Sequence, residues 1–348
     1  MSKGRGSPVN PANRFEALRY EHTVDDQEPV DEGPNRTQFF RDDTQSIISH
    51  NESPDVGFEV SVNPYRGCEH GCAYCYARPT HEYLGFSAGL DFESKIVVKM
   101  NAGELLHATL SKPTWQPQTL VLSGVTDCYQ PIERKLRLTR SCLEVLEEMR
   151  HPAYIVTKNQ LVTRDIDLLA SLASYQAAGV TLSVTSLDNE LAQRLEPRAS
   201  MPLARLAAIR SLANAGIPVT VNVAPIIPGL NDHEMPAILT AAAEHGATYA
   251  YYTLIRLPLT VADVFKAWLS THFPDRQTLI LGRIREMRNG KLNSSEFGDR
   301  MRGNGPVAEQ IRNLFHTVSR RVGLSQESPE LNTRAFRRTR PGQLELSL

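Results

Sequence analysis

Apolar and polar positions along the chain alternate between two periods. Residues 58–62 read Phe-Glu-Val-Ser-Val, the every-second-residue pattern of a half-buried strand. Short apolar runs recur further along, each followed by a segment with the spacing of an amphipathic helix. Six strands alternating with helices predict a parallel sheet with right-handed crossovers, too few units for a closed eight-unit barrel. The later predicted strands are 119–123, 154–157, 180–184, 219–223 and 249–255, and the helices are 139–150, 166–177, a segment from 189, 202–215 and 234–244.

Both ends of the chain lack this alternation. The first 50 residues are rich in Gly, Pro, Asn and Asp, so we expect a partly disordered arm that wraps the core near Phe15 and Phe39-Phe40. The C-terminal third predicts helices at 267–272, 278–287 and 311–322, with a Gly-, Ser- and Arg-rich loop at 290–303. The predicted segments are an arm at 1–55, a core at 56–260, a helical extension at 261–324 and a disordered tail at 325–348.

Charge changes this picture only through its distribution. The formal net charge is -1 over 348 residues, so bulk charge does not make the protein a polyanion binder. The arm is acidic, whereas the chain beyond residue 280 is rich in arginine. This asymmetry is compatible with a nucleic-acid surface and equally with a solvated charged face.

Cysteine usage and hydropathy predict a reducing cytoplasm. The chain has five cysteines, three of them in one short motif, which is not the pattern of a secreted disulfide framework. The first eight residues, Met-Ser-Lys-Gly-Arg-Gly-Ser-Pro, lack the apolar core of a signal peptide. No run of about 18 apolar residues occurs, so we expect no membrane span.

The cysteine motif lies between Gly67 and Tyr76, directly after the first predicted strand. Cys68, Cys72 and Cys75 are separated by three and then two residues. Three thiolates hold a four-iron cluster with one iron left open, and an open iron binds a substrate or cofactor. The alternative, structural zinc, needs four ligands and usually paired C-x2-C units, and no second pair occurs. The spacing therefore favours a [4Fe-4S] cluster at the C-terminal mouth of a strand.

With an aromatic residue before its last cysteine, this C-x3-C-x2-C motif resembles that of the radical S-adenosylmethionine (SAM) superfamily. The resemblance implies that SAM binds the open iron and is cleaved to a 5′-deoxyadenosyl radical that abstracts a hydrogen atom. It also implies an α/β fold, a partial (β/α)6 radical SAM barrel, here with an extended N-terminal arm and a helical, basic C-terminal extension. A reductant such as flavodoxin or ferredoxin is implied as a partner.

Further segments resemble the spore photoproduct lyase-like, or DNA repair photolyase-like, branch, roughly from Asn63 to Pro258. They include Thr126-Asp127, Lys158, Ser183 with the later Glu196-Pro197, and Ala224-Pro225-Ile226. The resemblance implies that Tyr74 and the backbone of Ala224 meet the adenine and that Ser183 contacts the ribose. It places Thr126 and Asp127 at the methionine amino group and Lys158 at its carboxylate, charge-assisted contacts that suit a zwitterion. The alternative is that Lys158 and Asp127 form an ordinary surface pair and Ser183 a strand-end turn.

One position departs from that branch. Spore photoproduct lyase donates a hydrogen atom from a cysteine shortly before the Ser/Thr-Asp pair, and Gly124 occupies the aligned place. The nearest thiol is Cys128, which becomes the candidate catalytic donor, although a cysteine is most often a small buried hydrophobe. Cys142 falls in a helical apolar stripe and is predicted to lie in the core.

Three hypotheses follow for function. The favoured one is a radical SAM enzyme acting on a nucleic-acid lesion or modified nucleotide. The second is radical modification of a protein or peptide. The third is a non-catalytic iron–sulfur protein that binds nucleic acid or transfers electrons, which has no need for Asp127, Lys158 and Ser183 around an open iron.

The arginines of the C-terminal region allow two interpretations. Arg300, Arg302 and those at 283–288 follow the sixth strand, so the chain there can fold back beside the barrel mouth. Arginine matches phosphate oxygens with its fork, which suits nucleic acid. The slightly favoured interpretation is a lid whose arginines pair with the acidic N-terminal arm.

Overall fold

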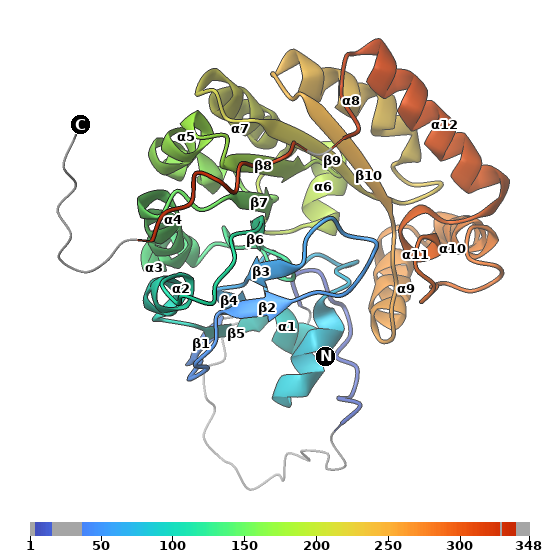
Figure 1. The fold of residues 1–348 in the computed structure, drawn as a ribbon. Coiled ribbons are helices and arrows are strands. Elements are labelled where there is room, and N and C mark those ends of the chain that lie inside the picture. The colour runs from blue at the N-terminus through green and yellow to red at the C-terminus, as the bar shows by residue number, and fades with distance from the viewer. Residues whose placement is uncertain (1–3, 16–36, 328, 339–348) are drawn as a thin grey trace, which may run out of the picture.

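The computed structural model describes residues 4–15, 37–327 and 329–338. Its centre is a seven-stranded sheet in the order β10-β9-β8-β7-β6-β3-β2, which curves into an open barrel with helices on its outer face (Figure 1). Every pairing in this sheet is parallel except that of β2 with β3. The strands are β2 (Ile48–His50), β3 (Val60–Val62), β6 (Leu120–Leu122), β7 (Ala153–Thr157), β8 (Ala178–Ser183), β9 (Val219–Ile226) and β10 (Tyr249–Leu254).

The six predicted strands are confirmed as the six parallel strands from β3 to β10. All six residues of β8 are buried, as expected of a strand covered by helices on one face and barrel interior on the other. The antiparallel edge strand β2 was not predicted, because three mostly exposed residues carry no hydrophobic period.

The helices of the barrel also match the predicted segments closely. Their apolar stripes face the sheet and form one large core together with the strands. Two further helices, α2 and α3, were not predicted. The barrel helices are α2 (Ala102–Leu110), α3 (Glu133–Leu136), α4 (Leu138–Glu148), α5 (Ile166–Ser174), α6 (Asn189–Leu195), α7 (Pro202–Asn214) and α8 (Met235–Glu244), with 3-10 turns η2 (Gln160–Asp165) and η3 (Asp232–Glu234).

A second, smaller sheet lies beside the cysteine motif. It has the order β1-β5-β4 and is joined to the motif by a 3-10 helix and a short α-helix. The predictions missed these elements because strands of two to four residues are too short to show a period. They are β1 (Gln38–Arg41), β4 (Tyr65–Arg66), η1 (Arg78–Leu84), α1 (Leu90–Ser94) and β5 (Lys95–Val98).

The N-terminal arm is more ordered than the sequence suggested, over the residues that the structure describes. Asn10 Oδ1 accepts from the Leu90 amide at 3.1 Å, and Asn13 Nδ2 donates to the Glu82 carbonyl at 3.0 Å. Side-chain amides, together with the Phe15 ring that packs on Tyr83, thus fix the arm to η1 and α1. The predicted partial disorder of the arm therefore does not include residues 4–15, and the prediction for 16–36 falls outside the described residues.

The predicted disordered tail is corrected in the same way for residues 329–338. Ser325 pairs with the start of β10, and the backbone amide of Asn332 donates to the carbonyl of Gln176 at 2.8 Å. The Arg337 amide donates to the Met149 carbonyl at 2.9 Å, and the Phe336 ring packs on His151. The segment therefore crosses the amino-terminal ends of the strands like a belt (Figure 1). Residues 339–348 lie outside the described part.

The C-terminal extension is helical, as predicted, and packs on the cysteine motif. Trp268 and Ile284 share a core with Cys72, Ala73 and Tyr74. No helix within the described residues is long and apolar enough to cross a membrane. The boundaries at 55/56, 260/261 and 324/325 stay predictions. The elements are α9 (Val261–His272), η4 (Pro274–Arg276), α10 (Gln277–Glu286), α11 (Asp299–Arg302) and α12 (Gly305–Arg321).

Candidate active site

A cavity of ≈ 310 Å³ lies at the carboxyl ends of the parallel strands, where barrel enzymes build their sites. The structure brings nine of the ten predicted site residues to this one cavity. They come from the cysteine loop and from the mouths of four successive strands. They are Cys68, Cys72, Cys75, Tyr74, Thr126, Asp127, Lys158, Ser183 and Ala224.

The three cysteines of the motif are free thiols, and burial raises the pKa of each. Glycine is required at Gly67 and Gly71, whose φ values of 82° and 66° lie in the left-handed region. A Cβ on Gly67 would also lie 3.0 Å from the Phe92 carbonyl oxygen. Three thiols on one cavity fit the donor set of a cluster, since thiolates are the ligands of iron–sulfur centres. No group of three His, Cys, Asp or Glu side chains in the described ranges converges on a single metal ion.

Arg78 fixes the loop that carries the cysteines, and sequence reasoning did not find it. Its guanidinium is fully buried and donates to the Cys72 carbonyl from Nε at 3.0 Å and to the Gly89 carbonyl from Nη1 at 2.7 Å. Glu93 Oε2 balances the charge at 2.9 Å. A buried guanidinium is costly unless all its donors are paired. The pairing of Arg78 with the Cys72 and Gly89 carbonyls and with Glu93 therefore holds the cysteine loop in a fixed position.

The N-terminal residues close the outer side of the same loop. A Cβ on Gly6 would lie 1.6 Å from the Gly71 carbonyl oxygen, so the two backbones are in close contact. The amides of Arg5 and Gly6 donate to the carboxylate of Glu93, at 2.5 and 3.3 Å. The arm therefore covers the cysteine loop without lining the cavity over the residues that the structure describes.

Asp127 connects two strand mouths. Its Oδ1 accepts from the Thr157 hydroxyl at 2.7 Å, and its Oδ2 accepts from the Lys158 amide at 2.8 Å. His70 Nδ1 lies 3.4 Å from the same Oδ2, and burial lowers the pKa of His70 more strongly than Asp127 raises it. A neutral His70 with its proton on Nδ1 donates to the carboxylate. Asp127 is thus held rigidly with one edge on the cavity.

Lys158 shows a different arrangement from the surface pair that the sequence allowed. Asp127 accepts from the backbone amide of Lys158, while the side chain lines the cavity. Among the described residues, none forms a hydrogen bond or ion pair with its Nζ. A half-buried ammonium facing a cavity without a fixed partner is suited to an anionic group of a ligand.

The buried ion pair between Glu196 and Arg205 lies behind Tyr74. The Tyr74 hydroxyl donates to Glu196, and the Thr185 hydroxyl donates to the same carboxylate oxygen at 2.6 Å. Burial raises the pKa of Tyr74, and the charge of Glu196 adds to the effect. Burial also opposes ionisation of Glu196, but Arg205 and Lys158 outweigh it, so the pKa of Glu196 is lowered. Arg205 binds the Ser183 carbonyl at 2.9 Å, which ties the network to the mouth of β8.

Strand β9 contributes backbone and one amide. The Ala224 carbonyl oxygen lies 3.0 Å from the Thr185 hydroxyl oxygen. Asn222 lines the cavity two residues earlier, and its buried Oδ1 has no hydrogen-bond partner within the described chain. An unpaired buried amide oxygen beside a cavity marks a position for a ligand donor. Asn222 was not predicted, because a polar residue inside an apolar strand gives no motif.

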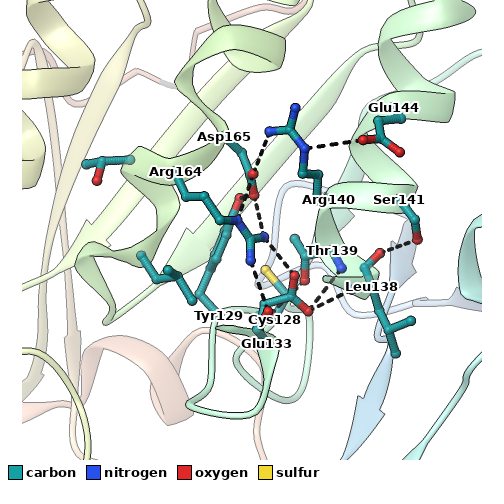
Figure 2. A network of polar contacts seen from close by, with 12 residues as sticks. Cys128, Tyr129, Glu133, Leu138, Thr139, Arg140, Ser141, Glu144, Arg164 and Asp165 are labelled. Atoms are coloured by element: carbon teal, nitrogen blue, oxygen red, sulfur yellow. Dashed lines mark hydrogen bonds and ion pairs between the residues drawn. The ribbon is translucent and has the colours of Figure 1, made fainter. Parts of the chain in front are cut away.

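Cys128 is the predicted site residue that the structure does not bring to the cavity. It is fully buried in the main core, and its neighbours belong to a polar network around Glu133 and Asp165 (Figure 2). Ser123 has φ 75°, and its hydroxyl accepts from the Cys128 amide at 2.6 Å, which turns 124–127 toward the cavity and Cys128 away from it. The prediction that Cys128 is the nearest donor is therefore corrected. Cys142 lies in the core, as predicted.

The loop after α10 closes one side of the cavity. Arg300 Nε pairs with Asp55, and the Gly298 amide donates to the same carboxylate at 2.6 Å. Arg288 is buried and donates to the carbonyls of Ile255 and Arg300, at 3.1 and 3.0 Å. These contacts favour the lid interpretation over phosphate binding for Arg300. We call the set Ser53, Asp55, Gly298 and Arg300 the clasp.

Arg256 and Tyr76 are two further lining residues that the sequence analysis did not identify. Tyr76 follows the last cysteine of the motif, and its ring is 47% exposed. Arg256 follows strand β10, and its guanidinium lies 5.1 Å from the centre of that ring. A single arginine after a strand carries no motif, so only the fold reveals it.

Comparisons with known proteins agree with this geometry. The family model of the radical SAM superfamily matches residues 62–242. An uncharacterized protein of Mycobacterium tuberculosis is 36% identical over 232 residues, covering 66% of this chain and 67% of that protein. A radical SAM Nalpha-GlyT isomerase of Pseudomonas phage M6 is 29% identical over 176 residues, covering 50% of this chain and 35% of the isomerase.

Solved structures show the same fold at low sequence identity. Spore photoproduct lyase complexed with dinucleoside spore photoproduct matches with a TM-score of 0.58 and 16% identity, over 83% of this chain and 81% of that one. A second structure of the lyase, a mutant, matches with a TM-score of 0.58 and 18% identity, over 80% of this chain and 78% of the other. Motif, barrel and family match together establish that the chain belongs to the radical SAM superfamily.

Proposed function

We propose that the chain binds a [4Fe-4S] cluster through Cys68, Cys72 and Cys75 and uses it to cleave SAM reductively. The observation that carries the proposal is the meeting of three free thiols, Lys158 and Asp127 on one cavity. The radical SAM family implies both cofactors, and together they supply a 5′-deoxyadenosyl radical that abstracts a hydrogen atom.

The protein's part is to hold the zwitterionic end of SAM. Lys158 offers its ammonium to the methionine carboxylate, since within the described chain that ammonium has no competing partner. Asp127 and Thr126 accept from the methionine amino group. Thr126 already donates its own hydroxyl proton to the Tyr65 carbonyl at 2.7 Å, so it has only lone pairs to offer. Two complementary charges at fixed positions set the orientation of the sulfonium.

The adenosine end lies over the mouths of β8 and β9. Tyr74 presents its ring to the adenine while its hydroxyl stays bonded to Glu196. Ser183 contacts the ribose, and the backbone near Ala224 meets the adenine edge. Asn222 Oδ1 adds an acceptor beside them. These assignments follow the strand mouths that the family uses and the cavity they line.

The reaction proposed here involves no cysteine donor from residue 124 or 128. Gly124 lines the cavity, and a Cβ there would lie 2.8 Å from Ser61 Oγ, so a larger side chain would displace Ser61. Among the described lining residues, the thiols are those of the three proposed cluster ligands.

The favoured substrate is a nucleic-acid lesion or modified nucleotide. It is supported by the likeness in fold to a lyase that is solved with a dinucleoside photoproduct. The similar phage protein is named an isomerase, so relatives differ in reaction type and we propose none. No described contact favours the peptide alternative, and an electron carrier would have no use for the Lys158 cavity. A flavodoxin or ferredoxin as reductant and a cytoplasmic location stay predictions.

The test is SAM cleavage by the anaerobically reconstituted protein. With dithionite the wild-type protein is expected to form 5′-deoxyadenosine, and Lys158→Ala is expected to form much less at low SAM concentration. Lys266→Ala is the matched control, because Lys266 pairs with Asp263 on the surface of α9. Equal rates for the two lysine variants would refute the proposed role of Lys158.

A further inference from the structure

The substrate side of the cavity has its own cation. Arg256 lines the cavity beside Tyr76, Met301 and Phe58. Its Nη1 contacts Met301 Sδ at 3.5 Å, a weak acceptor, and its buried Nε has no hydrogen-bond partner in the described chain. Burial lowers the pKa of Arg256. A guanidinium that has lost water and gained no oxygen partner is an incomplete site for an anion.

Arg256 is separate from the cation assigned to SAM. Arg256 follows β10, and the charged groups that act on it are Arg288 and, from the clasp, Arg300 and Asp55. Lys158 follows β7, which β8 and β9 separate from β10 in the sheet, and it acts on Glu196 and His70. The cavity therefore has one cation for the cofactor and another near the clasp.

An aromatic face accompanies this second cation. Tyr76 is fixed by its hydroxyl, which donates to the Gly124 carbonyl at 3.2 Å, while its ring stays partly exposed. A planar ring beside a guanidinium that lacks an oxygen partner matches a nucleobase joined to its phosphate, since aromatic faces stack bases and the arginine fork binds phosphate oxygens. A peptide carboxylate would use the guanidinium but would make no stacking contact with the ring.

We propose that Arg256 is the phosphate receptor of the substrate, with Tyr76 stacking the attached base. The inference rests on the proposed function, because it concerns the same cavity once SAM is bound. It assigns a nucleotide phosphate, rather than a nucleoside alone, as a recognised part of the substrate.

The experiment compares each of the four deoxynucleosides with its 5′-monophosphate. Binding is measured by equilibrium dialysis to the anaerobic, cluster-loaded full chain with SAM and no reductant. A hydrogen bond to a charged group contributes enough that the wild-type protein should bind at least one monophosphate about tenfold or more tightly than its nucleoside. In Arg256→Gln that ratio should fall to about one, and in Arg256→Lys it should be intermediate, because the charge remains without the fork.

Arg302→Gln is the matched control. Arg302 is an exposed arginine of the same region that lies over the Tyr252 ring and does not line the cavity, so its variant should keep the wild-type ratio. If Arg256→Gln loses the cluster, Arg256→Lys decides alone. A ratio that survives in both Arg256 variants would overturn the proposal.

Three further outcomes separate this inference from the proposed function. N-acetylglycine binding that depends on Arg256, with no nucleotide binding, would overturn it in favour of a peptide carboxylate. Absence of all nucleotide binding with intact SAM binding would overturn the inference and leave SAM cleavage standing. If the cluster-loaded wild-type protein does not bind SAM, the proposed function itself is refuted.

Discussion

Removing Arg205 should both destabilise the fold and loosen the cavity. Its guanidinium is 2% exposed, pairs with Glu196, and donates to the carbonyls of Ser200 at 2.7 Å and Ser183 at 2.9 Å. In Arg205→Leu, the buried carboxylate of Glu196 loses its cationic partner, and the two carbonyls lose the guanidinium donor. Tyr74 keeps its bond to Glu196, but that carboxylate is no longer held in place.

The magnitude follows from the buried charge. Breaking a buried ion pair by removing one partner costs about 3–5 kcal/mol, because the remaining charge stays desolvated. The control is Arg194→Leu, since Arg194 forms an exposed pair with Glu190 on the surface of α6. An exposed pair of this spacing contributes only about 0.3–0.5 kcal/mol. The two variants should therefore differ by roughly 3 kcal/mol in unfolding free energy.

Urea denaturation at neutral pH measures the difference in unfolding free energy between Arg205→Leu and Arg194→Leu. The pH dependence of the unfolding free energy tests whether the buried charge of Glu196 causes that difference. The folded-state pKa of Glu196 is lowered below the ordinary 4.5, so the wild-type protein keeps the pair's stability above that pH and loses it as pH falls further. Without Arg205, Glu196 is expected to take up a proton more easily, so the gap between variant and wild type should narrow in acid. A gap below about 1 kcal/mol at neutral pH, or one that widens in acid, would show that the buried charge of Glu196 does not depend on Arg205.

The remaining predictions concern the cofactors and one buried histidine. Cys72→Ala should lose most iron and sulfide on reconstitution, because two thiolates rarely retain four irons; near wild-type content would contradict the ligand assignment. Lys158→Ala should weaken SAM binding at least roughly tenfold with cluster absorbance intact, and an unchanged dissociation constant would contradict the carboxylate contact. Burial lowers the pKa of His151 to about 4, from 6.5, so neutral His151 stabilises the fold above pH 6.5 and this stabilisation is lost as pH falls toward 4. As pH falls from 7.5 to 5, the unfolding free energy measured with urea should fall by about 2 kcal/mol less for His151→Gln than for the wild-type protein. An equal fall in both proteins would contradict the lowered pKa of His151.

The sequence predicted the barrel because its strands carry strong, repeated signals. Strand β8 at 178–183 is buried along its whole length, and Val180, Leu182 and Val184 supply the apolar signal of the strand predicted at 180–184. The sequence does not indicate the order of the belt at 329–338 or of the arm at 4–15, because side-chain amides and backbone pairs hold much of both segments and such contacts have no hydrophobic period.

The candidate site was predictable where residues follow a motif or a strand mouth. Cys72 and Lys158 meet the cavity because parallel strands end at the same edge. Cys128 lies one residue beyond Asp127, yet a local turn at Ser123 directs it to the core. Arg256 depends on the three-dimensional course of β10 and the lid, which no local pattern encodes.

Cluster-dependent SAM cleavage is tested directly with one matched pair of proteins. Wild type and Cys72→Ala, reconstituted anaerobically under the same conditions, are incubated with SAM and dithionite, and 5′-deoxyadenosine is quantified by chromatography. We expect product from the wild type that requires dithionite and none above background from Cys72→Ala. Iron-loaded wild type that yields no 5′-deoxyadenosine, or a Cys72→Ala protein that yields as much as wild type, would contradict this expectation.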